Sequence, residues 1–317
     1  MSAMEALYLV FVSLSGLAMG SLAVLMLGHL MAEHWLAPVR AELEAAALTL
    51  PVLILIGIPL AFGLDQLFPW MSQRADLPPL RAAFLSPGFY LVRSAFYLLA
   101  CAGLAFWLVR NRQVRRASAI GLALMTPIMS FAAYDWVLSR DPHWWSTLFG
   151  FAYGLNQTLA ALACAILVTL LGAEHASPTR MKSLERALLT LALLTVWTWF
   201  SQFLIVWLAN LPAGAGWYLE RSDQQNLRLL TVSHLLMLIA IVVLVPSGVS
   251  RLGMIVGSAL ALLYHGTHML WILQPKGHPS WPALAVILGA TALWIAAYAF
   301  VMRTRPTYAE EALAEPE

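Results

Sequence analysis

The sequence predicts an all-α protein that crosses a membrane many times. Of its 317 residues, 61% are hydrophobic and only 11% are charged, and the mean hydropathy is +0.77. A soluble domain carries about 25% charged residues, so this chain has too few to cover a surface that faces water. Apolar stretches of about 20 residues, the length of a membrane-spanning helix, also recur along the whole chain. We therefore expect one polytopic helical bundle rather than the two soluble domains that the length suggests.

Nine stretches are long and apolar enough to be membrane helices. The first has no Lys or Arg ahead of it and no convincing cleavage site after it, so we expect it to stay as a helix. Together they form a single membrane domain, residues 1–302, and the short acidic tail 303–317 is expected to be disordered. The expected helices are 6–32, 46–68, 88–109, 117–138, 145–171, 185–208, 227–245, 251–273 and 281–302.

The positions of Lys and Arg predict the orientation of the bundle. One set of loops holds 11 of these residues and the other set holds 7, and the run RNRQVRR at residues 110–116 is the clearest signal. Because loops rich in Lys and Arg stay in the cytoplasm, we expect the N-terminus outside and the C-terminus inside. The formal net charge of +2 is too small to indicate nucleic acid as a partner.

Several polar side chains are expected at a similar depth near the outer side of the bundle. From the rise of about 1.5 Å per helical residue, they lie about 5–12 Å from the outer boundary. Charged groups in hydrocarbon cost about 2.5–3.5 kcal/mol each on insertion scales, and they usually face the bundle interior for a reason. The residues of this layer are Arg93, Asp135, Gln202, His234, His265 and His268.

A quinone pocket is one use for such a layer. Asp and His side chains can bind the oxygens of a quinol ring and relay its protons, and aromatic side chains can pack against the ring and its tail. A structural use is also open, because Trp and Tyr belong in interfacial belts and Arg93 with Asp135 can simply hold two helices together. The aromatic candidates are Tyr90, Trp136, Trp144, Trp145, Tyr264 and Trp271.

Metal binding and transport are the other two interpretations of the layer. His265 and His268 lie three residues apart on one helical face, with His234 at a matching depth, so they could hold a haem iron or copper. A di-haem protein, however, needs histidine pairs at two depths. Prolines within helices and the polar pair Asn156 and Gln157 could instead line a transport path, although little charge reaches the inner half.

The stretch AAYDWVLSRDPHWWSTLFGFAYG, residues 132–154, resembles the signature of the ActF membrane subunit of alternative complex III, a bacterial quinol:cytochrome c oxidoreductase. That family shows D-W-x-M-S-x-[DE]-P-H-W-x-S-T-x-[FY]-G, and this chain departs from it at Leu138. Three further stretches agree in order: GHLMAEHWLAPVRAELEAAALTLPVLILIGIPL, FLSPGFYLVRSAFYLLA and WTWFSQFLIVWLANLPAGAGWYLERS. They cover most of residues 20–230. In contrast, the stretch YHGTHMLW lacks the carboxylate that family members carry near the C-terminus, and the chain is shorter than theirs.

The resemblance implies the fold of the NrfD and PsrC membrane subunits, which is two four-helix bundles with peripheral helices. It also implies the bacterial inner membrane, and a complex with other membrane subunits and with iron–sulfur and c-type haem proteins, while this chain carries no haem or iron–sulfur cluster of its own. The matching motif residues are Asp135, His143, Ser146 and Thr147, with Arg93 and Gln202 in the other stretches. In the family this region is associated with a quinone pocket or a proton path.

We therefore expect a quinol-interacting or proton-relaying subunit of a respiratory electron-transfer complex. A structural anchor of the same complex and a proton-coupled secondary transporter are the alternatives. The expected cofactor is a quinone or quinol, and no metal site is expected. The candidates for proton relay are Asp135, His143, His234, His265 and His268, and those for the quinone pocket are Arg93, Gln202, Trp136, Ser146 and Thr147. We also expect Ser139 or Asp141 to cap the helix that follows the motif.

Overall fold

Every regular element in the described part of the chain is a helix, which confirms the all-α class. The computed structural model describes residues 1–31, 34–172, 178–246, 248, 250–275 and 277–305. Within these residues, nine segments are long and apolar enough to cross a membrane, as predicted. The long helices are α1 (Ala3–Met31), α7 (Pro87–Arg110), α8 (Val114–Trp136), α9 (Phe149–Leu171), α10 (Pro178–Ala209), α12 (Gln224–Leu244), α13 (Arg251–Leu273) and α14 (Trp281–Met302).

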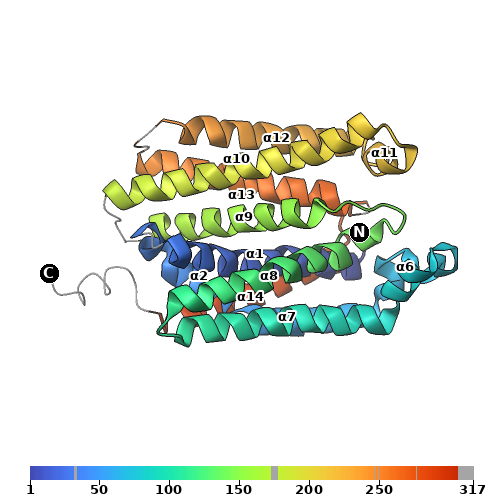
Figure 1. Ribbon diagram of the computed structural model, residues 1–317, viewed down its shortest axis with the longest axis horizontal. Helices are drawn as coiled ribbons and strands as arrows, with labels where there is room; N and C mark the ends of the chain where they lie inside the picture. Colours follow the sequence, from blue (N-terminus) through green and yellow to red (C-terminus); the bar gives the residue numbers. More distant parts are fainter. Residues whose placement is uncertain (32–33, 173–177, 247, 249, 276, 306–317) are drawn as a thin grey trace.

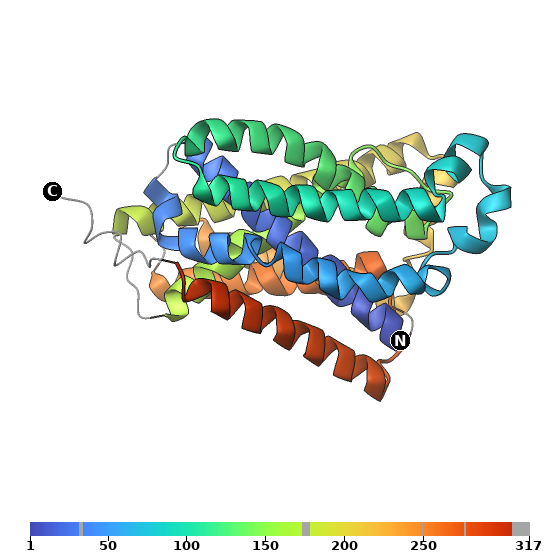
Figure 2. The same ribbon diagram turned by 90° about the horizontal axis from the view of Figure 1, so that it is seen from below.

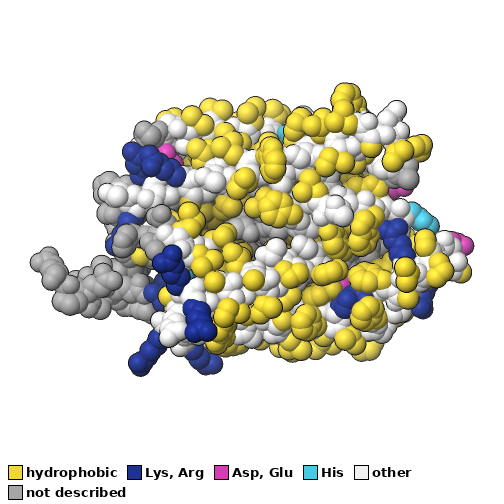
Figure 3. Space-filling model, in the orientation of Figure 1, with side chains coloured by type: hydrophobic (Ala, Val, Ile, Leu, Met, Phe, Trp, Pro, Cys, Tyr) yellow, Lys and Arg dark blue, Asp and Glu magenta, His cyan; other side chains and the backbone are white. Residues whose placement is uncertain are grey.

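The long helices lie side by side, and their two ends differ in charge. The N-terminus lies at one end, which we call the N-terminal end, together with the short helices α6 (Pro79–Phe84) and α11 (Pro212–Leu219) (Figure 1). Most of the Lys and Arg side chains visible in Figure 3 gather at the opposite end, where α7 ends at Arg110 and α14 ends at Met302. We call this the basic end. Which end faces the cytoplasm stays a prediction, and residues 306–317 of the expected tail lie outside the described residues.

The membrane segments form two groups of four, with α14 outside them. The first group is α1, the segment Trp35–Phe62, α7 and α8, and the second is α9, α10, α12 and α13. The two groups meet where α1 and α8 pack against α9. Helix α14 packs against α1, α2 and α3 and lies at the edge of the molecule (Figure 2).

The contact between α1 and α9 depends on small residues. Gly16 and Gly20 of α1 are four residues apart, a spacing that lets two helix backbones approach closely in a membrane. A Cβ atom on Gly20 would lie 2.3 Å from the backbone oxygen of Gln157 in α9. No side chain fits at this position without moving a backbone, so Gly20 sets how closely the two groups of helices pack.

The second membrane segment is not where we predicted it. We expected a helix over 46–68, but the segment is Trp35–Phe62. It consists of η1 (His34–Val39), α2 (Arg40–Ala47), α3 (Leu50–Gly57) and η2 (Ile58–Phe62), and the chain then turns through α4 (Leu64–Leu67), α5 (Trp70–Gln73) and η3 (Arg74–Asp76). Residues 40–45, which precede the predicted helix, include the charged residues Arg40, Glu42 and Glu44. In the folded chain Glu44 is buried between Arg40, at 2.9 Å, and Arg305, at 3.0 Å, which allows a helix there.

Candidate functional site

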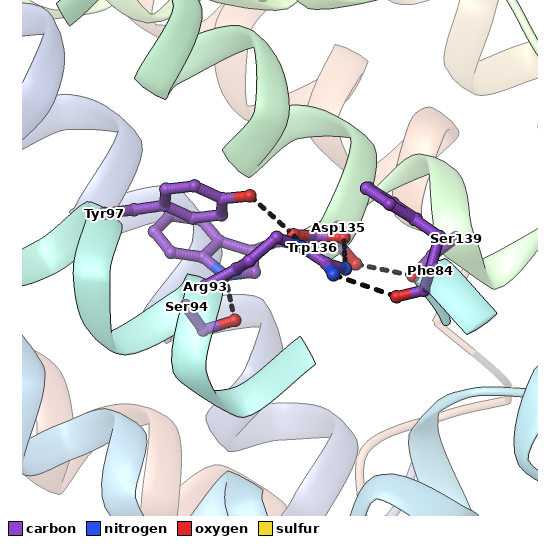
Figure 4. A network of polar contacts seen from close by, with 7 residues as sticks. All are labelled: Phe84, Arg93, Ser94, Tyr97, Asp135, Trp136 and Ser139. Atoms are coloured by element: carbon purple, nitrogen blue, oxygen red, sulfur yellow. Dashed lines mark hydrogen bonds and ion pairs between the residues drawn. The ribbon is translucent and has the colours of Figure 1, made fainter. Parts of the chain in front are cut away.

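Three side chains from α7 and α8 form the Asp135 cluster near the N-terminal end of the bundle (Figure 4). Arg93 Nε donates to Asp135 Oδ2 at 2.8 Å, and Arg93 Nη2 donates to Oδ1 at 2.7 Å. The hydroxyl of Tyr97 donates to Oδ2 at 2.8 Å. Arg93 and Tyr97 are four residues apart and therefore share one face of α7, the face that meets α8. The contact between the predicted partners Arg93 and Asp135 is thus present.

The surroundings of Arg93 hold its guanidinium group in one place. Its Nη1 donates to the backbone oxygen of Phe84 at 2.9 Å, and its Cζ lies 3.8 Å from the ring centroid of Phe84 and 4.2 Å from that of Phe89. Asp135 is fully buried, whereas 11% of the Arg93 side chain is exposed. Removing one partner of a buried ion pair costs about 3–5 kcal/mol, because the other charge is left without compensation.

The next residue on each of the two helices makes a second link. The indole Nε1 of Trp136 donates to Ser94 Oγ at 3.1 Å. The backbone oxygen of Trp136 accepts a hydrogen bond from Tyr8 of α1, and Phe11 of α1 packs edge-on against its ring at 5.1 Å. Three helices of the first group are therefore joined around Trp136.

A cavity of about 150 Å³ adjoins this link. It lies between α1, α7, α8 and the end of the second membrane segment, and most of its lining is apolar, for example Phe11 and Leu98. The lining residues with polar atoms in their side chains are Tyr8, Tyr90, Ser94 and Trp136. Ile58, which also lines the cavity, is 52% exposed, so the cavity extends to a residue at the surface of the bundle.

A second polar cluster, the histidine cluster, consists of Asn156 of α9 and His265 and His268 of α13. Asn156 Nδ2 lies 3.3 Å from His268 Nδ1, and Asn156 Oδ1 lies 3.3 Å from His265 Nδ1. All three are buried. The amide nitrogen can only donate and the amide oxygen can only accept, so this arrangement fits a proton on His265 Nδ1 and none on His268 Nδ1. Aromatic rings enclose His268, with Trp199 at 4.6 Å and Tyr264 at 5.2 Å.

The junction between α8 and α9 is tied to the second group of helices by an ion pair. Arg221, in the loop between α11 and α12, lies 2.7 Å from Asp141 and also donates to the backbone oxygens of Trp217 and Ile272. Burial lowers the pKa of Arg221, and the carboxylate of Asp141 partly offsets this effect. An arginine nevertheless stays charged, so the pair is an electrostatic contact between distant loops.

Trp144 is the apolar centre of the same junction. Its ring stacks on Trp217 of α11 at 4.6 Å, and its Nε1 donates to the backbone oxygen of Gly214 at 3.0 Å. Its own backbone oxygen accepts from Arg81 of α6 at 2.8 Å. Arg140 reaches the end of α13, where it donates to the oxygen of Leu273 at 2.8 Å. Arg140 and Asp141 of the motif therefore tie this junction to other segments at the N-terminal end.

Neither Ser139 nor Asp141 caps α9, although we expected one of them to do so. Leu148 is the residue before α9, and it makes no cap with its side chain. Ser139 instead donates to the backbone oxygen of Asp135 at 2.5 Å, and Asp141 is taken up by Arg221. The prediction was wrong because six further residues, 143–148, separate Pro142 from the start of α9. Trp144 lies in this connection and is held there by its contacts with α6 and α11.

The remaining candidate residues do not join either cluster by a hydrogen bond. Gln202 of α10 accepts from Ser146 Oγ at 3.1 Å. Thr147, His143 and Trp145 have exposed side chains, and the backbone oxygen of Thr147 accepts from Tyr134 at 2.9 Å. His234 is exposed, and its Nδ1 lies 2.8 Å from the oxygen of Leu230 on its own helix. The predicted layer is thus divided between two separate clusters, and its members Gln202 and His234 bond elsewhere.

Sequence reasoning missed four side chains that shape these sites. Tyr97 could have been found from its spacing of four residues after Arg93, which places both on one face of α7. Tyr8, Ser94 and Arg221 had no such signal, because their partners lie 42 to 128 residues away along the chain.

No protein-family model matches this sequence, and no curated protein matches it significantly. Within the described residues, no group of three or more His, Cys, Asp and Glu side chains lies close enough to hold a metal ion. His234, which we considered with His265 and His268 as a third metal ligand, is exposed, and its Nδ1 contacts the oxygen of Leu230. The function is therefore argued from the two clusters and the cavity.

Proposed function

We propose that this chain is a quinol-interacting subunit of a respiratory electron-transfer complex of the quinol:cytochrome c oxidoreductase type. The cavity beside the Asp135 cluster is the single observation that carries the proposal. It is an apolar space of about 150 Å³ that Ser94 and Trp136 help to line. These two residues directly follow Arg93 and Asp135, the partners of the buried ion pair, in the sequence. An apolar cavity of about 150 Å³ accommodates one six-membered ring.

The lining of the cavity suits a quinol ring. Tyr90 and Ser94 carry hydroxyl groups that can bind the ring oxygens, and the other walls are mainly apolar. Ligand pockets commonly combine apolar walls with a few polar groups that fix the orientation of the ligand. In this proposal the isoprenoid tail leaves past Ile58, which is exposed to the surroundings of the bundle.

Asp135 and Arg93 affect this site indirectly, because they fix the positions of the two helices that carry Ser94 and Trp136. The carboxylate of Asp135 accepts three hydrogen bonds from α7, two from Arg93 and one from Tyr97. We therefore assign Asp135 to holding α7 against α8, and with them Ser94 and Trp136.

The proposal includes partners, because electrons removed from the quinol must pass to another redox group. The resemblance to alternative complex III assigns them to iron–sulfur and c-type haem subunits in the bacterial inner membrane. A pull-down of the tagged chain in mild detergent, followed by a visible spectrum and identification of bound proteins, checks this assignment. Haem c absorbance with iron–sulfur partners supports it, and a colourless protein without partners contradicts it.

A binding experiment tests the cavity itself. Ala95 lines the cavity, whereas Leu99, one turn further along α7, has an exposed side chain outside it. We expect Ala95→Phe to reduce binding of decylubiquinone or a short-chain menaquinone analogue at least tenfold in equilibrium dialysis, because the added ring fills the space. The control Leu99→Phe should bind like the unchanged protein. Equal binding by all three proteins would overturn the proposal.

A structural anchor is the second candidate, and the buried ion pair between Asp135 of α8 and Arg93 of α7 favours it. Asp135→Asn separates the two functions when the whole complex is purified. Lost quinol-dependent turnover in an assembled complex supports a site of chemistry, whereas failed assembly supports an anchor.

A further inference from the structure

A larger cavity lies on the other side of the α1–α9 contact, toward the basic end. It measures about 430 Å³ and is bounded by α1, η1, α9 and α10. Leu27 of α1, Leu162 of α9 and Leu191 of α10 contribute to its apolar walls. None of its lining residues belongs to the Asp135 cluster or the histidine cluster, so it forms a separate site.

One face of α10 runs along this cavity and changes from polar to apolar. Ser183 and Arg186 lie at the basic end, Thr190 follows, and Leu194 lies deepest. These residues recur at intervals of three and four, so they form one stripe on the helix. From Ser183 to Leu194 the stripe is about 16 Å long, at 1.5 Å per residue. That is about half of the 30 Å hydrocarbon core of a bilayer, or one leaflet.

The charge at the mouth of the cavity is positive. Arg186 is exposed, and Lys182 lies exposed one turn earlier on α10. Among the described residues that line the cavity, none carries a carboxylate. The neighbouring Glu185 is buried on another face of α10, where its Oε2 accepts from the backbone nitrogen of Gly248 at 3.2 Å. An anion that reaches the mouth therefore meets cations first.

We propose that this cavity binds one anionic phospholipid of the leaflet at the basic end. Its phosphate binds Arg186, the hydroxyls of Ser183 and Thr190 lie beside the glycerol region, and one acyl chain lies against Leu162 and Leu191. The length of the stripe favours a lipid over a transmembrane partner helix, because a helix would pack along the full thickness of the membrane. The inference is independent of the quinol proposal, since the two cavities share no residue.

Native mass spectrometry of the delipidated protein in detergent tests the proposal. Equal amounts of dioleoyl phosphatidylglycerol and dioleoyl phosphatidylcholine are added, and bound lipids are counted. We expect one phosphatidylglycerol to be retained preferentially. Arg186→Gln should weaken its binding about tenfold, because it removes a charge-assisted hydrogen bond. Ala187→Phe, which keeps the charge and fills the cavity, should also remove the retained lipid.

Two controls make the result specific. Arg115→Gln removes a charge at the basic end outside this cavity, and Arg228→Gln removes an exposed charge at the N-terminal end. Both should retain the lipid, and size-exclusion profiles show whether each variant is folded. Equal losses in Arg186→Gln and Arg115→Gln would indicate general attraction to the basic end and overturn the proposal. Retention by Ala187→Phe, or complete displacement of the lipid by millimolar inorganic phosphate, would overturn it as well.

Discussion

The Asp135 cluster and the histidine cluster are both buried polar sites within the same bundle, but they are built differently. In the Asp135 cluster, both carboxylate oxygens accept charge-assisted hydrogen bonds of 2.7 and 2.8 Å. In the histidine cluster, the contacts of Asn156 are neutral and 3.3 Å long. Hydrogen bonds between charged groups are about twice as strong as neutral ones.

The polar groups next to the two clusters also differ in how completely they are hydrogen-bonded. Around the histidine cluster, the Nε1 of Trp199 and the Oε1 of Gln157 are buried without a hydrogen-bond partner among the described residues. Around the Asp135 cluster, Trp136, Ser139 and Arg93 all have partners. The comparison indicates that the first cluster locks two helices with strong bonds, whereas the second joins its helices by weaker, neutral contacts.

Breaking the ion pair should have the largest effect. We expect Asp135→Leu to lower the free energy of unfolding by about 3–5 kcal/mol, because Arg93 keeps a charge without its partner. The double variant Asp135→Leu with Arg93→Met should recover much of that loss, since neither charge is then buried. Thermal unfolding in detergent measures both. A double variant as unstable as the single one would contradict a locking function for the pair.

Gly20→Leu tests whether the packing of α1 against α9 supports the histidine cluster, and it changes none of the polar groups in that cluster. The new side chain would collide with the backbone of Gln157, the neighbour of Asn156, and overpacking of this kind costs about 1–3 kcal/mol. Gly103→Leu is the matched control, because nothing lies within 4 Å of a Cβ at that position of α7. Thermal unfolding of both variants measures the difference. Similar stability of the two would show that α1 and α9 can separate freely.

His268→Gln should have a smaller effect than Asp135→Leu. It removes one neutral hydrogen bond and the ring contacts with Trp199 and Tyr264, which together predict a loss of about 1–2 kcal/mol. His234→Gln serves as its control, since that side chain is exposed. If His268→Gln destabilises the protein as much as Asp135→Leu in thermal unfolding, the two clusters do not differ as proposed.

The smallest effect is expected outside both clusters, at Asp223. This exposed residue caps α12, and its hydrogen bonds from the backbone nitrogens of Asn226 and Gln225 lower its pKa. A lowered pKa in the folded state means that the stabilisation is present at neutral pH and is lost as the pH falls through the acid range. Asp223→Asn should therefore show a shallower loss of thermal stability between neutral and acid pH. An unchanged pH profile would contradict this assignment.

The sequence predicted the membrane segments well and the contacts between them only in part. Seven of the nine expected helices match the observed ones within four residues at each end, and the sixth begins at Pro178 instead of residue 185. The second began earlier because Glu44 is neutralised by Arg305 from the far end of the chain. The Arg93–Asp135 pair was predicted from depth and charge. The close packing of α1 was missed, although Gly16 and Gly20 have the spacing that indicates it.

The sequence by itself determined that this protein is an all-α membrane bundle with one basic end. Composition and hydropathy are properties of each segment alone, so they need no knowledge of neighbours. Only the tertiary structure decided that Asp135 meets Tyr97, that Asp141 meets Arg221, and that the histidines divide between a buried pair and an exposed residue. Nearly uniform hydrophobicity leaves the rotation of each helix about its axis undetermined, and that rotation selects which polar groups meet.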